Sequence, residues 1–296
     1  MQTTITLIGA GGKMGCRITD NLMDSGFRML YSEIGKNGLE QLKLRGLMTT
    51  PQNDAVKVSD AVILAVPDIA IGQVAAEVVP QMNPESMLIV LDPAAAYLGH
   101  LPVREDVTYF VAHPCHPPVF NEETDPEARK DYFGGVKAAQ AVVCALMQGP
   151  EEHYENGERI VRSMYAPVIR THRITVEQMA MLEPTMAETI GAAAAMFLRQ
   201  AMDEAVKRGV PAQAARDFML GHINIELAIA FGEAGNPFSD ACLIAMEYGR
   251  RFWLKDGWEQ LFDPEHVRNQ IQVMLHPEKL EEISVAERGA DATCGK

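Results

Sequence analysis

Two histidines three residues apart, His113 and His116, stand in the proline-rich stretch VAHPCHPPVF. Two neutral imidazoles could bind zinc or another transition metal, although such a site needs at least one more ligand. Alternatively, one of them could be a general base that accepts a proton while a substrate loses hydride. In a third interpretation both side chains only hydrogen-bond a stiff loop. The stretch itself does not decide between the three.

A carboxylate in the second half of the chain could complete such a site. Glu183 lies in the apolar stretch MLEPTMAET, directly before Pro184. A buried carboxylate needs a partner, and a metal held by His113 and His116 would be one. In the alternative interpretation, Glu183 is an exposed residue in the first turn of a helix.

The overall composition limits the partners of the protein. The 296 residues are 47% hydrophobic and carry a net charge of −14. That is enough apolar chain for one large domain or two smaller ones. The negative average field disfavours nucleic acids and anionic membranes as partners, whereas a small-molecule substrate is compatible with it.

The sequence also favours one cellular compartment. Its five cysteines contain no CxxC pair, which is typical of free thiols in a reducing cytoplasm. The stretch MQTTITLIGAGG at the amino terminus does not resemble a signal peptide, and no apolar run approaches the roughly 18 residues of a membrane span. We therefore expect a cytoplasmic protein with no membrane partner.

Short apolar segments alternate with helical patterns in the first part of the chain. The predicted strands are TTITLIG, FRMLYSE, DAVILAVPD, SMLIVLDPA, VTYFVAHP, AAQAVVCALMQ and PVIRTHRI. This alternation predicts an α/β fold in which a doubly wound parallel sheet of Rossmann type occupies residues 1–174. Only helical patterns follow, so we expect an all-α domain for substrate binding or dimerisation at residues 175–296.

The turn GAGGKMG joins the first predicted strand to a predicted helix, which is the context of a dinucleotide site. Gly9 allows a tight turn, and Gly11 and Gly12 let the backbone approach a pyrophosphate. Lys13 and Met14 begin the helix, whose amino terminus offers N–H donors and a positive dipole end. The spacing departs from G-x-G-x-x-G because Met14 occupies the place of the last glycine. The alternative interpretation is a plain strand–helix turn.

Acidic residues at three strand ends are further candidates for cofactor binding. Glu33 ends the second predicted strand, near the usual position of the carboxylate that binds the adenosine ribose. Because it would bind a 2′-hydroxyl and repel a 2′-phosphate, we expect NAD rather than NADP, unless Glu33 is a plain surface residue. Asp68 and Asp92 also follow strands, and each could contact the cofactor or cap the next helix.

The helical half carries a small-residue face, IGAAAAM, on which another helix can pack closely. Because these helices are rich in apolar residues, we expect a homodimer through this domain. Close packing within one subunit is the alternative. His222 and Asn224, in LGHINIE, could line the substrate site, but buried residues with satisfied hydrogen bonds are the favoured interpretation.

Taken together, the stretches IGAGGKMG, AVPD, LDPAAAYLGHLP, YFVAHPCHPPVF and MLEPTMAET resemble the D-apionate oxidoisomerase family. The resemblance covers essentially the whole chain, and HPCHPPVF is its most specific part. The family is similar to the 6-phosphogluconate dehydrogenase-like group and is often described as semialdehyde dehydrogenases. A looser likeness links the chain to prephenate dehydrogenases, which carry a His-Pro motif in a similar place. The Lys and Asn that the phosphogluconate enzymes use are absent from EQMAMLEPTMAET.

The resemblance implies NAD-dependent oxidation of D-apionate coupled to a rearrangement that gives 3-oxo-isoapionate. It also implies a divalent metal, such as zinc, as Lewis acid, with His116 and Glu183 as direct ligands and His113 as a ligand or the base. The main alternative is a simple NAD-dependent β-hydroxyacid or prephenate-type dehydrogenase without a metal, in which His113 is the base. The third interpretation is an NAD-binding sensor, which would tolerate the loss of these three side chains.

Overall fold

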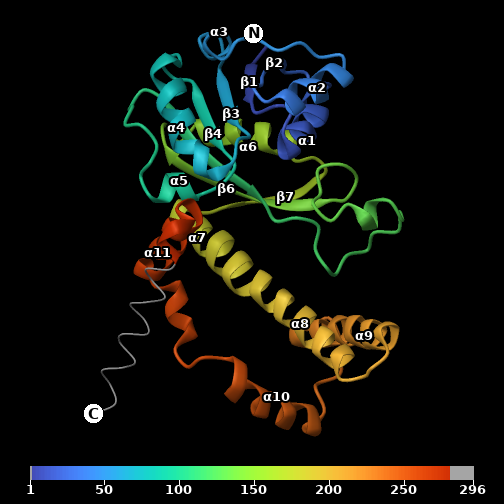
Figure 1. Ribbon diagram of the computed structural model, residues 1–296. Helices are drawn as coiled ribbons and strands as arrows, with labels where there is room; N and C mark the ends of the chain where they lie inside the picture. Colours follow the sequence, from blue (N-terminus) through green and yellow to red (C-terminus); the bar gives the residue numbers. More distant parts are fainter. Residues whose placement is uncertain (1, 281–296) are drawn as a thin grey trace, which may run out of the picture. The chain divides into compact units, whose positions relative to one another are not determined.

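The computed structural model describes residues 2–280 of the chain, which fall into two compact units (Figure 1). The first unit reaches from the amino terminus to Met181 and resumes at Ile271, and the second comprises Leu182–Gln270. The first unit contains a mixed sheet with its covering helices, and the second is helical.

One seven-stranded sheet forms the centre of the first unit. Its order is β2-β1-β3-β4-β5-β6-β7, and the strands from β2 to β5 in this order are parallel. β6 is antiparallel to β5, and β7 runs parallel to β6, so the last two strands reverse the direction. All seven predicted strands are confirmed: β1 (Thr4–Ile8), β2 (Arg28–Ser32), β3 (Ala61–Leu64), β4 (Met87–Val90), β5 (Thr108–Pro114), β6 (Gln140–Gln148) and β7 (Val168–Arg173).

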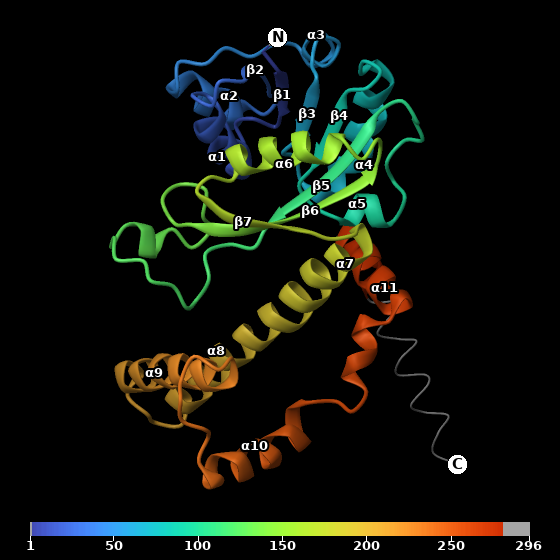
Figure 2. The same ribbon diagram turned by 180° about the vertical axis from the view of Figure 1, so that it is seen from behind.

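Helices cover both faces of this sheet, which confirms the predicted Rossmann architecture. α1 (Lys13–Leu22) and α6 (His153–Met164) lie on one face, and α4 (Asp68–Val78) lies on the other (Figures 1 and 2). Every residue of β1, β3 and β4 is therefore buried, as in other sheets that are covered on two sides. The shorter helices are α2 (Lys36–Leu44), α3 (Gln52–Val56), η1 (Val79–Gln81), α5 (Ala94–Tyr97) and η2 (Ala128–Lys130).

A long helical segment follows the sheet, as predicted. It consists of α7 (Val176–Ala180), the π-helical η3 (Met181–Ala192) and α8 (Ala193–Lys207). A capping box starts it, in which Thr175 and Gln178 exchange side chain–backbone hydrogen bonds. Pro184, which has no N–H to donate, lies within η3. The π-helical form was not predicted, and such segments are frequent at functional sites.

The second unit buries few of its own side chains. Neither α8 nor α10 (Asp240–Trp253) contains a buried residue, and α9 (Ala212–Ala230) contains one, Ala215. His222 and Asn224 are exposed, so the prediction that they are buried is wrong for the single chain. The remaining elements are η4 (Trp258–Phe262), α11 (Pro264–Leu275) and η5 (Pro277–Lys279).

Within the described residues, no helix combines the length and the apolar character needed to cross a lipid bilayer.

Candidate active site

The glycine turn between β1 and α1 is tightly enclosed by backbone. Gly9 has φ +77°, and a Cβ there would lie 2.4 Å from the carbonyl oxygen of Ala65. A Cβ on Gly15 would lie 2.0 Å from the carbonyl oxygen of Gly9. Any other residue at either position must displace main chain, so both glycines are required for the strand and the helix to approach each other.

Gly11 and Gly12 differ in what surrounds them. A Cβ on Gly11 would lie 2.1 Å from the carbonyl oxygen of Gly38 in α2, whereas the nearest atom to a Cβ on Gly12 is 3.3 Å away. A Cβ on Gly11 would therefore overlap the backbone of α2, whereas a Cβ on Gly12 would make a tight contact with the carbonyl oxygen of Gly9. The amide of Gly11 donates to Glu33, and that of Gly12 donates to Gly9. The first-turn amides at Lys13 and Met14 are then the donors that a helix start offers to a pyrophosphate.

This contrast yields a stability prediction. Gly15→Ala is expected to destabilise the fold by about 1–3 kcal/mol, because backbone must move to admit the methyl group. Gly12→Ala is expected to cost less stability than Gly15→Ala, because its methyl group would lie 3.3 Å from the nearest backbone oxygen. It is expected to weaken NADH binding, because the methyl group is added to the turn that approaches the pyrophosphate. Thermal unfolding and fluorescence titration with NADH measure the two effects. Equal stability of both variants would contradict the assignment of Gly15 to packing.

Asp68 lies at the start of α4 but is not its N-cap. Pro67 is the N-cap of α4 and no side-chain cap bond forms there, so the prediction that Asp68 caps this helix is wrong. Asp68 is instead the first helical residue, where its negative charge favours the positive end of the helix dipole. It borders a cavity of about 360 Å³ together with Gly72 and His100. A contact between Asp68 and the cofactor stays a prediction.

The register of β4 and β5 brings two candidate ligands together. Val90 pairs with Val111 in these parallel strands, so Asp92 and His113, each two residues further on, lie side by side near the ends of the two strands. Asp92 is buried, and its Oδ1 accepts a hydrogen bond of 2.7 Å from the amide of Ala94. Asp92 thus accepts from the amide of the first residue of the short helix α5, although the N-cap of that helix is Pro93. The Nδ1 of His113 lies 2.9 Å from the carbonyl oxygen of Leu91.

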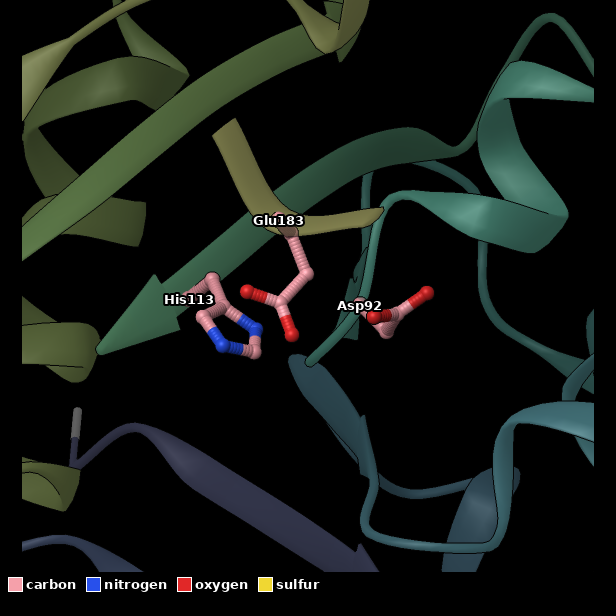
Figure 3. Close-up of side chains that lie close together, drawn as sticks. All are labelled: Asp92, His113 and Glu183. Carbon is pink, nitrogen blue, oxygen red and sulfur yellow. The ribbon is translucent and has the colours of Figure 1, made fainter. Parts of the chain in front are cut away.

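Glu183 joins this pair from the start of the long helical segment. It is the third residue of η3, which continues directly from α7. In Figure 3 its side chain extends toward His113 and Asp92. One ligand atom from each of the three residues lies within 4.8 Å of the others. Two ligands of one divalent cation stand no more than about 5 Å apart, so the three side chains fit a metal site.

His116 lies beside this group and is not a member of it. Its φ is +61°, a conformation that L-residues seldom adopt and that occurs preferentially at functional sites. Its Nδ1 lies 2.9 Å from the carbonyl oxygen of Phe133, and its ring centroid is 6.1 Å from that of His113, with the rings nearly perpendicular. The Phe133 ring also contacts the ammonium of Lys13, at 3.9 Å from the ring centroid. The 115–139 loop thus connects His116 to the glycine turn.

Sequence patterns alone did not place Asp92 among the ligands. They indicated only a helix cap or a cofactor contact, because a single strand end does not tell which neighbouring strand lies beside it. Cys144, opposite Ala112 in the antiparallel pair of β5 and β6, belongs to the hydrophobic core. Burial raises the pKa of Cys144 on β6 to about 12, so its thiol stays protonated and acts as a core residue.

Two family models together match nearly the whole described chain. Residues 1–121 match the NADPH-binding domain of acetohydroxy acid isomeroreductase. Residues 121–275 match the C-terminal domain of phosphogluconate dehydrogenase (decarboxylating). Both matches agree with a dinucleotide-binding domain followed by a helical one.

Individual relatives are considerably closer. A D-apionate oxidoisomerase from Cupriavidus necator is 50% identical over 273 residues, which cover 92% of this chain and 99% of that protein. One from Rhizobium rhizogenes is 51% identical over 272 residues, with the same two shares. A crystal structure of a semialdehyde dehydrogenase NAD-binding protein from Cupriavidus necator, in complex with calcium and NAD, has a TM-score of 0.90 at 50% identity, covering 92% of this chain and 99% of that one. The chain therefore belongs to the D-apionate oxidoisomerase family.

Proposed function

We propose that this protein is an NAD-dependent oxidoisomerase that converts D-apionate to 3-oxo-isoapionate in sugar-acid catabolism. The observation that carries the proposal is the group of Asp92, His113 and Glu183. The group stands where β4 and β5 end, at the edge of the sheet at which Rossmann domains bind their ligands. Relatives at 50% and 51% identity carry this activity in their names, and the NAD complex of a similar structure supports the choice of cofactor.

The reaction consists of two balanced steps. First, the C2 carbon of D-apionate gives hydride to NAD+, and its hydroxyl proton goes to a base, which leaves a 2-oxo acid. A hydroxymethyl group then migrates from C3 to C2: the bond to C3 breaks, a bond to C2 forms, and the C3 hydroxyl becomes a carbonyl. The proton lost at C3 is returned to the oxygen on C2. The second step is redox-neutral, so one NADH forms per turnover.

His113 is suited to hold one of these protons. When its Nδ1–H donates to the carbonyl of Leu91, the neutral imidazole carries its lone pair on Nε2, the atom that can take a proton or bind a metal. The bond to the main chain also fixes the orientation of the ring. The half-buried position of His113 beside Asp92 and Glu183 limits the access of water to the proton.

Asp92, Glu183 and His113 would together hold a divalent cation. When bound, such an ion acts as a Lewis acid toward the carbonyl and hydroxyl oxygens of the substrate. Two carboxylates and one imidazole suit magnesium, manganese or calcium as well as zinc. The predicted zinc is therefore one of four ions that these ligands suit. The prediction that His116 is also a ligand is tested by the same experiment, in which we expect the loss of its ring to leave the ion bound.

Metal content and turnover, measured on the same samples, test this proposal. Wild type, Glu183→Ala and His116→Ala are analysed for bound metal and for NADH formed from D-apionate, and the product is identified by NMR. We expect about one divalent ion per wild-type chain, and loss of both ion and turnover in Glu183→Ala. A metal-free wild type that still forms NADH and a stable 2-oxo acid would instead identify a simple dehydrogenase.

The two histidines are expected to respond differently to substitution. His113→Ala should lose the ion and lower kcat/KM by about a thousandfold, because a base or ligand is removed. His116→Ala should keep the ion, since His116 lies outside the group of Asp92, His113 and Glu183, and should lower kcat/KM by roughly tenfold to a hundredfold. Elemental analysis and steady-state kinetics measure both. Loss of metal from His116→Ala alone would reverse the two assignments.

We also propose that the protein is cytoplasmic and homodimeric. The cysteines in the described part of the chain are unpaired: Cys16, Cys115, Cys144 and Cys242. Free thiols are typical of a reducing compartment. The homodimer is supported by the exposed apolar helices of the second unit.

A further inference from the structure

The carboxylate of Glu33 is bound by main-chain amides on both of its oxygens. Its Oε1 accepts hydrogen bonds from the amides of Ile34, at 2.8 Å, and Gly35, at 2.7 Å. Its Oε2 accepts one of 2.9 Å from the amide of Gly11. The last bond joins the end of β2 to the glycine turn across 22 positions of the sequence. Glu33 therefore links the two loops that border the adenosine half of a Rossmann cofactor site.

Gly38 in α2 packs directly against the carboxylate of Glu33. A Cβ on Gly38 would lie 2.4 Å from both Cδ and Oε2 of Glu33. A Cβ on Gly11 would lie 2.1 Å from the carbonyl oxygen of Gly38 and 2.4 Å from its Cα. The three residues are thus packed directly on one another, and none can gain an atom without moving another.

We infer that Glu33 and Gly38 are positioning residues that set the shape of the glycine turn for NAD, in addition to any contact of Glu33 with the ribose. Gly38 keeps the space into which the Glu33 carboxylate fits, and the carboxylate holds the Gly11 amide. Removal of the charge should therefore not convert the protein to NADP, since the turn that binds the pyrophosphate of both cofactors loses its support. The inference rests on the proposed use of NAD.

Glutamine cannot replace the carboxylate in this position. A carboxylate accepts hydrogen bonds on two oxygens, whereas an amide has one accepting oxygen and one NH₂ group that only donates. If the amide oxygen of the glutamine accepts from Ile34 and Gly35, its NH₂ group faces the N–H donor of Gly11. If the amide is turned over, the NH₂ group faces the N–H donors of Ile34 and Gly35 instead. Glu33→Gln therefore removes the charge with almost no change in volume and breaks one of the two connections.

Two variants and one control test the inference. Glu33→Gln breaks the connection chemically, and Gly38→Ala leaves the charge but pushes the carboxylate away from Gly11. Glu40→Gln, an exposed carboxylate on α2, is the matched control. The dissociation constants of NADH and NADPH are measured by fluorescence titration. Hydrogen exchange of the peptide over residues 9–15 is measured without cofactor, so that one result is independent of cofactor binding.

We expect both variants to bind NADH at least about tenfold more weakly than wild type, as for loss of a hydrogen bond to a charged group. Neither should gain affinity for NADPH, and residues 9–15 should exchange faster in both. The control should match wild type. A Glu33→Gln variant that binds NADPH more tightly with unchanged exchange would overturn the inference and make Glu33 a simple selector. Unchanged NADH binding and exchange in Gly38→Ala would also overturn it.

These outcomes separate the inference from the proposed function. If wild type does not bind NADH, the proposed cofactor is wrong, while faster exchange of residues 9–15 in both variants would still establish the connection in the cofactor-free protein. If Gly38→Ala does not fold, Glu33→Gln decides alone, because its volume is nearly that of the original side chain.

Discussion

Replacement of Glu183 by glutamine is expected to lower kcat/KM for D-apionate by about a thousandfold or more, which is the range found when a charged group that acts in the chemical step is removed. Glutamine keeps the size of the side chain, so the start of η3 should fold unchanged. The variant loses the negative charge that, with Asp92 and His113, would hold a divalent cation. Binding of NADH should stay within about twofold of wild type, because the glycine turn is untouched.

The measurement combines steady-state NADH formation, bound metal and NADH affinity. Glu177→Gln is the matched control, since Glu177 is an exposed carboxylate in the first turn of α7 and should leave all three quantities unchanged. A Glu183→Gln variant that keeps its ion and a tenth of its turnover would show that Glu183 neither binds the metal nor takes part in the reaction.

The sheet could be predicted from the sequence because most of its strands are short apolar runs bounded by turn residues. The direction of β6 and β7 could not be predicted in this way. Between Pro114 and Gln140 the sequence has no helical pattern long enough for a crossover, and parallel neighbours need such a connection. β6 instead returns antiparallel to β5, with Val143 opposite His113. The missing crossover helix was the available signal for this reversal.

The candidate site was predicted only in part, because the sequence gives strand ends without their neighbours. His113 and Glu183 were expected near each other, and they are. Asp92 required the order of the strands, since only the pairing of Val90 with Val111 places it next to His113. His116 follows His113 closely in sequence, yet the positive φ at His116 turns its side chain toward Phe133.

The sequence also could not tell whether the helical half buries its apolar residues within one chain. Periodicity shows that a helix has an apolar face and says nothing about which chain covers it. His222 is an example of a residue that the periodicity places wrongly. It was expected to be buried, but it is exposed and stacked on Phe218, with ring centroids 3.9 Å apart. The expectation of a homodimer came from the same apolar residues whose exposure the structure describes.

A charged substitution on α10 is expected to abolish the proposed homodimer. Ile244, Tyr248 and Phe252 follow one another at intervals of four residues and therefore share one face of the helix. Their exposed fractions are 72%, 67% and 75%. Full burial of each such side chain contributes about 1.5–3 kcal/mol to the free energy of association. In an interface with twofold symmetry every contact occurs twice. We expect wild type to be a dimer in light scattering at micromolar concentration, and the double variant Ile244→Asp/Phe252→Asp to be a monomer.

The exposed apolar side chains of the second unit are not confined to α10. Large apolar side chains are exposed on all three of its long helices: Met196, Phe197, Phe218, Leu220, Ile225, Leu243, Ile244, Met246, Tyr248, Phe252 and Trp253. Large exposed apolar surfaces on soluble proteins often mark sites of protein–protein interaction. The monomeric variant should therefore also lose helical circular dichroism, whereas Glu247→Gln, in the same helix, should keep both dimer and helix content. A wild-type monomer with stable helices would contradict the dimer, and a stable complex with a different protein would identify another partner for the same face.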